Sequence, residues 1–125
     1  MKNTQNHLSH STRLMIQIAV VLCGIGVNTA ALSETAETQA VTALGKLNGI
    51  ALACEQPALS TRIRDLIVSL APKNRETGVV FETATTDAFL KQGQEGAVCP
   101  NGKTLADQIE AQMRILQQQN QLDKQ

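Results

Sequence analysis

The cysteine count is the feature that most limits how this chain can fold. Its three cysteines are Cys23, Cys54 and Cys99. Cys23 falls in an apolar N-terminal run that is typical of a removed export signal. The remaining two form an even number, as expected for one disulfide in a short secreted chain. We therefore predict a Cys54–Cys99 bridge, which in the chain-entropy model contributes about 4 kcal/mol. That is a large fraction of the roughly 5 to 10 kcal/mol of net stability expected of a small domain.

A redox-active or metal-binding thiol pair is the alternative to a structural bridge. The sequence contains no C-x-x-C spacing, and its two histidines, His7 and His10, both lie in the predicted export signal. A metal site would need further ligands of this kind. The pattern therefore favours a structural disulfide, and we expect no metal and no cofactor.

The N-terminus has the three-part layout of a secretory signal peptide. Lys2 and Arg13 precede an apolar run over 14–27, and small residues follow up to Ser33. The run is shorter than the roughly 20 residues that span a bilayer. We predict a signal peptide over 1–33, a periplasmic or secreted protein, and no stable membrane insertion after its removal. Cleavage after Ser33 is preferred, and cleavage after Ala30 or Ala31 stays open.

Membrane attachment is the alternative localisation, either by an uncleaved signal or by lipidation at Cys23. A lipid-acceptor cysteine usually follows small residues, whereas the bulky Leu22 precedes Cys23. The sequence therefore favours export without an anchor.

Charge excludes two classes of partner. The whole chain carries 11 basic and 11 acidic residues. Removal of the signal takes away Lys2 and Arg13 but no acid, so a small net negative charge remains. No run of like charge is present, which argues against binding to nucleic acid or to anionic lipid headgroups.

We divide the exported part into a helical domain over 34–116 and a disordered polar tail over 117–125.

Apolar periodicity predicts the first two helices. Over 34–54, with Ser33 or Thr35 as the N-cap, apolar residues recur at intervals of three and four, as on one face of a helix. A second helix begins at Pro57 and ends before Pro72, which cannot continue it. The predicted core faces are Ala40, Leu44, Leu47, Ala51 and Cys54 in the first helix, and Leu59, Ile63, Leu66, Ile67 and Leu70 in the second.

The second half of the domain is less regular. Over 73–92 we prefer a helix capped by Asn74, with a break near Thr86, because a strand over 77–86 would have no partner. A loop over 93–103 holds Cys99. Thr104 then caps a last helix, with Asp107 in a capping-box arrangement. The predicted fold class is all-α, a small bundle of about four short helices stapled by one disulfide.

Gly45 and Gly49 are the candidate binding residues. Their spacing of four makes a smooth strip on the first helix, where another helix could approach closely. A membrane GxxxG motif does not apply, because Lys46 and Asn48 lie between them. The alternative is that the two glycines only weaken the helix. We interpret the strip as a partner-binding helix face.

The exported chain lacks the residues of the common catalytic sites. It contains no histidine, so its serines and threonines have no such base to activate them, and it contains no nucleotide-binding or hydrolase motif. We expect no catalytic residue and no enzyme.

The predicted function is a small exported helical interaction module that binds another envelope protein or a peptide through an apolar helix face. One alternative is a carrier of a small apolar ligand in an inter-helix cavity. Another is a chaperone-like or accessory subunit of an envelope complex. The oligomeric state stays open.

Overall fold

The computed structural model describes residues 35–125, which belong to one compact unit, Glu34–Gln125. Four helices make up this part of the chain: α2 (Ala36–Ala53), α3 (Pro57–Leu70), α4 (Arg75–Glu95) and α5 (Gly102–Leu122). The predicted all-α class and the predicted number of helices are confirmed. The predicted signal peptide over 1–33 and Cys23 lie outside the described residues.

Side-chain caps fix where three of the helices begin. The Thr35 hydroxyl accepts from the Thr38 amide at the start of α2, and the Asn74 amide oxygen accepts from the Thr77 amide at the start of α4. Asn74 was the predicted cap, and Thr35 was one of the two predicted candidates, the other being Ser33. The cap of α5 is Asn101, whose side chain accepts from the Thr104 amide at 2.9 Å. The prediction of Thr104 as the cap was wrong, because the extended backbone of Asn101 already presents a strong N-cap oxygen three residues earlier.

α4 is a single uninterrupted helix. The strand alternative over 77–86 and the break near Thr86 are both ruled out, because α4 continues from Arg75 to Glu95. Its threonines are poor helix formers, but packing on α2 outweighs this weak preference. The helix ends at Gly96, which adopts the left-handed conformation with φ of 58°. The loop predicted from residue 93 therefore begins three residues later.

α5 continues beyond its predicted end. The sequence predicts a disordered polar tail over 117–125, whereas the helix runs to Leu122. The side-chain amide of Asn120 donates to the backbone oxygen of Leu70 at 2.6 Å and to that of Leu116 at 3.1 Å. The last turns of α5 therefore cover the end of α3, which is why the polar sequence is ordered there.

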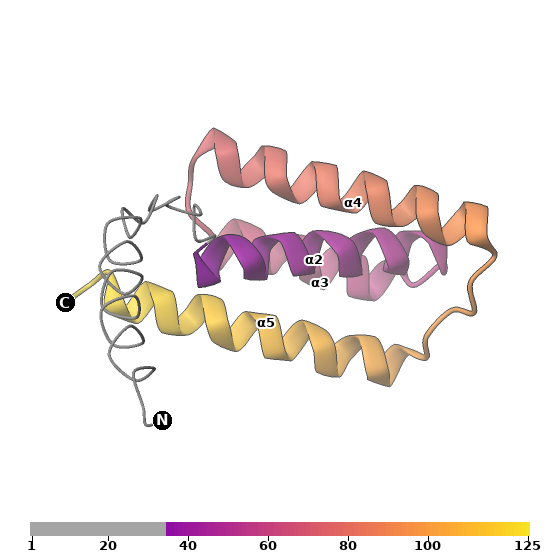
Figure 1. Cartoon of the computed structure of the whole chain (residues 1–125). Helices are drawn as coiled ribbons and strands as arrows, with labels where there is room; N and C mark the ends of the chain where they lie inside the picture. The colour runs from indigo at the N-terminus through magenta and orange to yellow at the C-terminus, as the bar shows by residue number, and fades with distance from the viewer. Residues whose placement is uncertain (1–34) are drawn as a thin grey trace, which may run out of the picture. The chain divides into compact units, whose positions relative to one another are not determined.

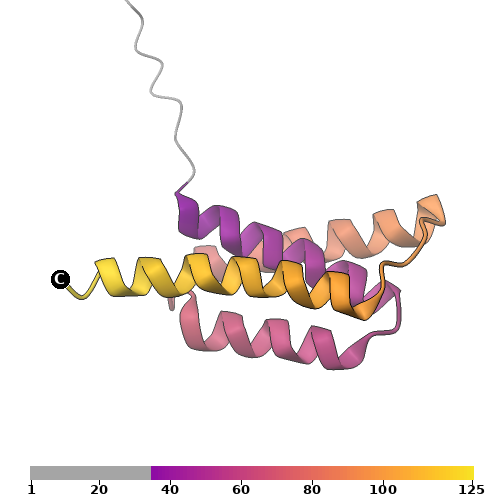
Figure 2. The same cartoon turned by 90° about the horizontal axis from the view of Figure 1, so that it is seen from below.

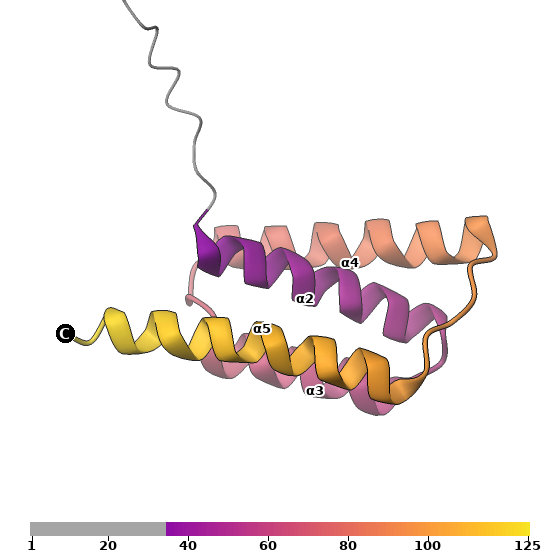
Figure 3. The ribbon, with the colours of Figure 1, turned by 60° about the horizontal axis from the view of Figure 1, so that its bottom comes forward.

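α2 is the central helix of this part of the chain. Its backbone lies against those of α3, α4 and α5, α3 also lies against α5, and α4 lies against α2 alone (Figures 1 and 3). Seen from below, α5 runs along α2 and α3, and α4 stands on the other side of α2 (Figure 2). The result is a three-helix core with a fourth helix attached to one of its members.

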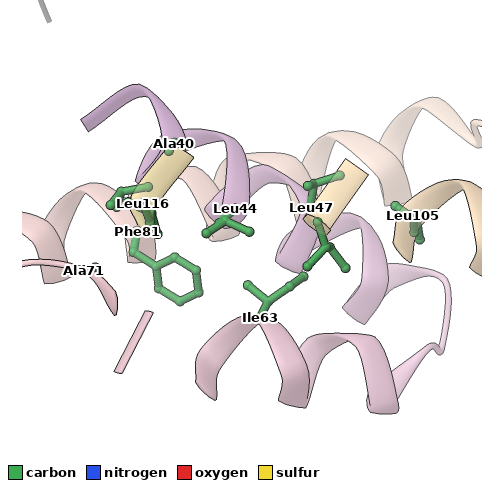
Figure 4. Packing of buried hydrophobic residues seen from close by; sticks show 10 residues of the cluster. Ala40, Leu44, Leu47, Ile63, Ala71, Phe81, Leu105 and Leu116 are labelled. Atoms are coloured by element: carbon green, nitrogen blue, oxygen red, sulfur yellow. The ribbon is translucent and has the colours of Figure 1, made fainter. Parts of the chain in front are cut away.

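The core lies where α2, α3 and α5 meet. Leu44, Ile63, Leu105, Ile109 and Leu116 are fully buried, and Phe81 of α4 reaches into the same cluster (Figure 4). Ala40, Leu44, Leu47 and Ala51 are buried as predicted, whereas Cys54, the fifth residue of that predicted face, is half-buried and follows the end of α2. On α3 only Ile63 of the predicted stripe is fully buried, and the other four residues are partly buried.

The predicted disulfide is confirmed. Cys54, directly after α2, is bonded to Cys99, in the loop before α5, with a Cα–Cα distance of 5.6 Å. Nearby, the side-chain amide of Gln56 donates to the backbone oxygen of Pro100 at 2.9 Å. These two links fix the loop to the end of the central helix and so hold the start of α5 in place.

Candidate functional site

The glycine strip of α2 is occupied by the protein's own α4. A Cβ atom at Gly45 would lie 2.7 Å from the backbone oxygen of Phe81 and 2.8 Å from the Cβ of Ala84. At Gly49 it would lie 2.7 Å from the backbone nitrogen of Phe89. The predicted close helix approach is thus confirmed, but the prediction that Gly45 and Gly49 form a partner-binding face was wrong. A spacing of small residues predicts close approach, not the identity of the approaching helix.

These contacts also set the direction of α4. Gly45 faces Phe81 and Thr85, and Gly49 faces Thr85 and Phe89, so residue numbers rise together along the two helices. α2 and α4 are therefore parallel neighbours and form a two-helix layer.

A chain of hydrogen bonds crosses three helices beside the glycine strip. The Arg64 guanidinium donates to the Ser60 hydroxyl at 3.2 Å, and Ser60 donates to the side-chain oxygen of Asn48 at 2.7 Å. The Asn48 side-chain amide donates to the Thr85 hydroxyl at 3.3 Å, and Thr85 donates to the backbone oxygen of Gly45 at 3.2 Å. The sequence analysis did not predict these hydrogen bonds. The polar Asn48 between two glycines was their only signal.

The hydrogen bonds that link Arg64, Ser60, Asn48, Thr85 and Gly45 have a structural role. Asn48, Ser60 and Thr85 are all buried. Among the described residues no buried side-chain polar atom lacks a hydrogen-bond partner. Each hydroxyl donates to an oxygen that is not a strong base, so neither Ser60 nor Thr85 is activated as a nucleophile. These hydrogen bonds fix the register of α3 and α4 on α2.

A groove follows the other side of the α2/α4 layer and encloses about 680 Å³. We call it the α2/α4 groove. Apolar and small side chains predominate in its floor, and polar or charged ones stand along its edges. Its floor holds the buried or half-buried apolar residues Ile50, Val80, Ala84 and Ala88. The exposed Val79 is the one apolar residue at its edges, which also hold Thr42, Lys46, Thr83, Asp87, Lys91, Gln92 and Glu95.

The charges along the groove are balanced. Lys46 and Lys91 are positive, and Asp87 and Glu95 are negative. Within residues 35–125 the ion pairs are Arg62–Glu110 and Lys103–Asp107, so these four groove charges belong to neither pair. The groove therefore offers charges of both signs to an incoming surface.

Exposed apolar side chains gather on α4. Val79, Phe89 and Leu90 keep 55%, 45% and 49% of their surface in contact with solvent. Val79 and Leu90 share one helix face with Thr83 and Asp87, which line the groove, because these positions follow a spacing of three and four residues. Among the helices of residues 35–125, α4 has a single neighbour, and none of them covers this face.

A second, smaller hollow of about 250 Å³ lies between the N-terminal ends of α2 and α4. Its lining includes Thr35, Glu37, Asn74 and Glu76. Burial, and then the nearby Asp123 carboxylate, raise the pKa of Glu37 above its ordinary value of 4.5. A helix N-terminus favours a negative charge, and Glu37 and Glu76 already supply it in the first turns. We therefore expect no further anion to bind in this hollow.

Potential metal ligands are dispersed over residues 35–125. No three histidine, cysteine or acidic side chains come together there as they would around a metal ion. Within the same range, no helix combines the length and the apolar character needed to cross a membrane.

No protein-family model matches the chain, and no significant match is found among curated proteins or solved structures.

Proposed function

We propose that this chain is a small exported helical module that binds a partner protein of the cell envelope in the α2/α4 groove. The observation that carries the proposal is the groove itself, whose apolar floor lies between unpaired charges of both signs. Apolar surface supplies most of the free energy of association, while charges at the edge select the partner and its orientation. This combination is typical of a protein interface.

The groove has the shape that receives a helix. Two helices packed side by side leave a trough along their length, and side chains of a third helix fit into it as ridges fit into grooves. The small Ala84 and Ala88 in the floor allow a close approach. A helix-in-groove complex is therefore the mode of recognition that we propose.

Export is supported by the disulfide and by the predicted signal over 1–33. Structural disulfides are maintained in oxidising compartments such as the periplasm. Intact mass of the protein purified from the envelope tests this part of the proposal. We expect a chain beginning near Glu34 whose mass increases by two hydrogens on reduction. Free thiols at Cys54 and Cys99, or a lipid on a chain beginning at Cys23, would contradict it.

Two exposed threonines of α4 provide a matched test of the groove. Thr83 lines the groove, whereas Thr86, three residues later, does not. Thr83→Arg should block the groove and abolish capture of the partner after chemical crosslinking of whole cells. Thr86→Arg adds the same side chain to the same helix and should leave capture unchanged. Equal capture by both variants, with both folded by circular dichroism, would contradict the proposal.

A carrier of a small apolar ligand is the second candidate, because the volume of the groove falls within the range of small-molecule sites. Binding of a fluorescent apolar dye distinguishes the two functions. A carrier should bind the dye stoichiometrically and lose it with Thr83→Arg. An interaction groove without a deep enclosed cavity should bind it weakly and without saturation.

A further inference from the structure

We propose that the occupant of the α2/α4 groove is a second copy of this chain, so that two α2/α4 layers pack face to face across a two-fold axis. This inference rests on the proposed function, because it uses the same groove and names its partner. It is argued from the single neighbour of α4, from the geometry of the layer and from the charges along the groove.

The first step concerns α4. In a helical bundle each helix usually packs against at least two others, but within the described part of the chain the backbone of α4 lies against that of α2 alone. Its face carrying Val79 and Leu90 is about half exposed. A fifth helix in the groove would give α4 its second neighbour and would cover apolar surface that is now in water.

The second step concerns symmetry. A two-fold axis is the commonest symmetry of protein dimers, and it brings the same patch of both copies together. If the axis is perpendicular to α4, the two copies of α4 run antiparallel. Each copy of α4 then lies in the groove of the other. The four helices of the two layers form a bundle in which every helix has neighbours on two sides.

The third step concerns charge along α4. Asp87, Lys91 and Glu95 follow one another at intervals of one helical turn with alternating sign. An axis halfway between Asp87 and Lys91 sets Asp87 of each copy against Lys91 of the other. The same alignment sets Glu95 against the turn of the other copy that holds Thr83.

The last charge of the groove fits this alignment. Lys46 follows Gly45, which packs against Phe81, Ala84 and Thr85, so Lys46 is level with the turn that holds Thr83. Glu95 of the other copy would therefore approach Lys46. All four groove charges, which form no ion pair within residues 35–125 of one copy, would gain an opposite charge in the dimer. The groove is thus complementary in charge to itself.

Charge reversal in the disulfide-bonded exported chain tests the alignment. Analytical ultracentrifugation of the unmodified protein should show a reversible monomer–dimer equilibrium. Asp87→Lys alone and Lys91→Asp alone each create two like-charge contacts and should raise the dimer dissociation constant by about tenfold or more. The double variant restores both contacts and should return the constant to within a few-fold of the original.

Glu82→Lys is the control, because it makes the same change on the same helix at an exposed position that does not line the groove. It should leave the dissociation constant unchanged. A protein that stays monomeric up to its limit of solubility would overturn the proposal, and so would a dimer that none of the reversals weakens. Single reversals that weaken the dimer without rescue by the double variant would also overturn it.

The same variants separate this proposal from the proposed function. If the protein is monomeric but Thr83→Arg still abolishes capture of another envelope protein, the second copy is not the occupant and the interaction groove stands. If the protein is monomeric and nothing is captured through the groove, both proposals fail.

Discussion

The side chain of Asn48 connects Ser60 of α3 with Thr85 of α4 while itself belonging to the central helix. Asn48→Ala would remove both hydrogen bonds and leave the buried Ser60 hydroxyl without its acceptor. We expect a loss of about 2 to 3 kcal/mol in the free energy of unfolding. Ser60→Ala removes only the hydrogen bonds of the Ser60 hydroxyl and should lower the free energy of unfolding by about 1 kcal/mol.

Urea unfolding followed by circular dichroism measures both losses, since the chain has no tryptophan or tyrosine for fluorescence. A loss from Asn48→Ala of less than about 0.5 kcal/mol, the size of an ordinary surface substitution, would show that the polar chain does not hold the helices together.

Gly49 and Gly78 make a matched pair on the two helices of the layer. Alanine normally stabilises a helix by about 1 kcal/mol relative to glycine. At Gly49 the added Cβ would lie 2.7 Å from the backbone nitrogen of Phe89, so α4 would have to move. Overpacking of this kind costs about 1 to 3 kcal/mol. We expect Gly49→Ala to destabilise the protein despite its better helix propensity.

At Gly78 no atom lies within 4 Å of the added Cβ. Gly78→Ala should therefore raise the thermal midpoint, reflecting a gain of about 0.5 to 1 kcal/mol. If both alanine variants were more stable than the original protein, the close packing of α4 on Gly49 would be refuted.

Glu37 should make the stability depend on pH. Burial and the Asp123 carboxylate raise its pKa above 4.5 in the folded protein. The folded state therefore holds the proton more tightly than the unfolded state. Folding is disfavoured by this group at neutral pH, and the penalty disappears as the pH falls through the raised pKa toward and below 4.5. The effect has the opposite sign to that of a carboxylate in an ion pair.

Asp123→Asn removes one of the two causes. We expect the pKa of Glu37, followed by the NMR shift of its side-chain carboxyl carbon, to fall part of the way toward its ordinary value. Burial would maintain the remainder of the shift. An unchanged pKa would show that Asp123 does not influence Glu37.

Among the elements, α4 should be the least protected from local unfolding, because it has one helix neighbour and several exposed apolar residues. Hydrogen exchange should be faster in α4 than in α2. Replacing Cys54 and Cys99 by serine should lower the free energy of unfolding by about 2 to 4 kcal/mol. It should speed exchange most near 92–101. Equal exchange rates in α2 and α4 would contradict this account of the layer.

The sequence predicts those helices whose signals are local. The apolar face of α2, the Thr35 and Asn74 caps and the Pro57 start of α3 all depend on neighbouring residues, and all are confirmed. The disulfide follows from counting cysteines. The end of α5 could not be found in this way, because its order depends on the hydrogen bond from Asn120 to Leu70 of another helix.

The candidate site illustrates the same limit. Gly45 and Gly49 signal a close helix contact, but only the fold shows that α4 makes it. The α2/α4 groove combines residues of two helices that are far apart in sequence, and its shape depends on their parallel arrangement. Periodicity within either helix contains no information on that arrangement, so the groove could not be predicted.

At the scale of the whole described unit, residues 35–125, a disulfide-stapled core supports α4 and leaves one side of the α2/α4 layer without a covering helix from this range. Most of the core cluster comes from α2, α3 and α5, while α4 packs closely on α2 and contributes Phe81, Ala84 and the partly buried Val80. The uncovered side of α4 is the physical reason for placing the binding surface on this helix. A helix that packs on the core through one face can present the apolar and charged residues of another face to a partner.

The measurement that tests this account most directly is photo-crosslinking in intact cells, with a photoreactive phenylalanine analogue introduced at Thr83 or, as the control, at Thr86. Both positions are exposed on α4, and only Thr83 lines the groove. We predict a discrete protein adduct from position 83, of twice the mass of the chain if the partner is a second copy, and little adduct from position 86. Equal adducts from the two positions, or none from either, would contradict the assignment of the groove as the binding site.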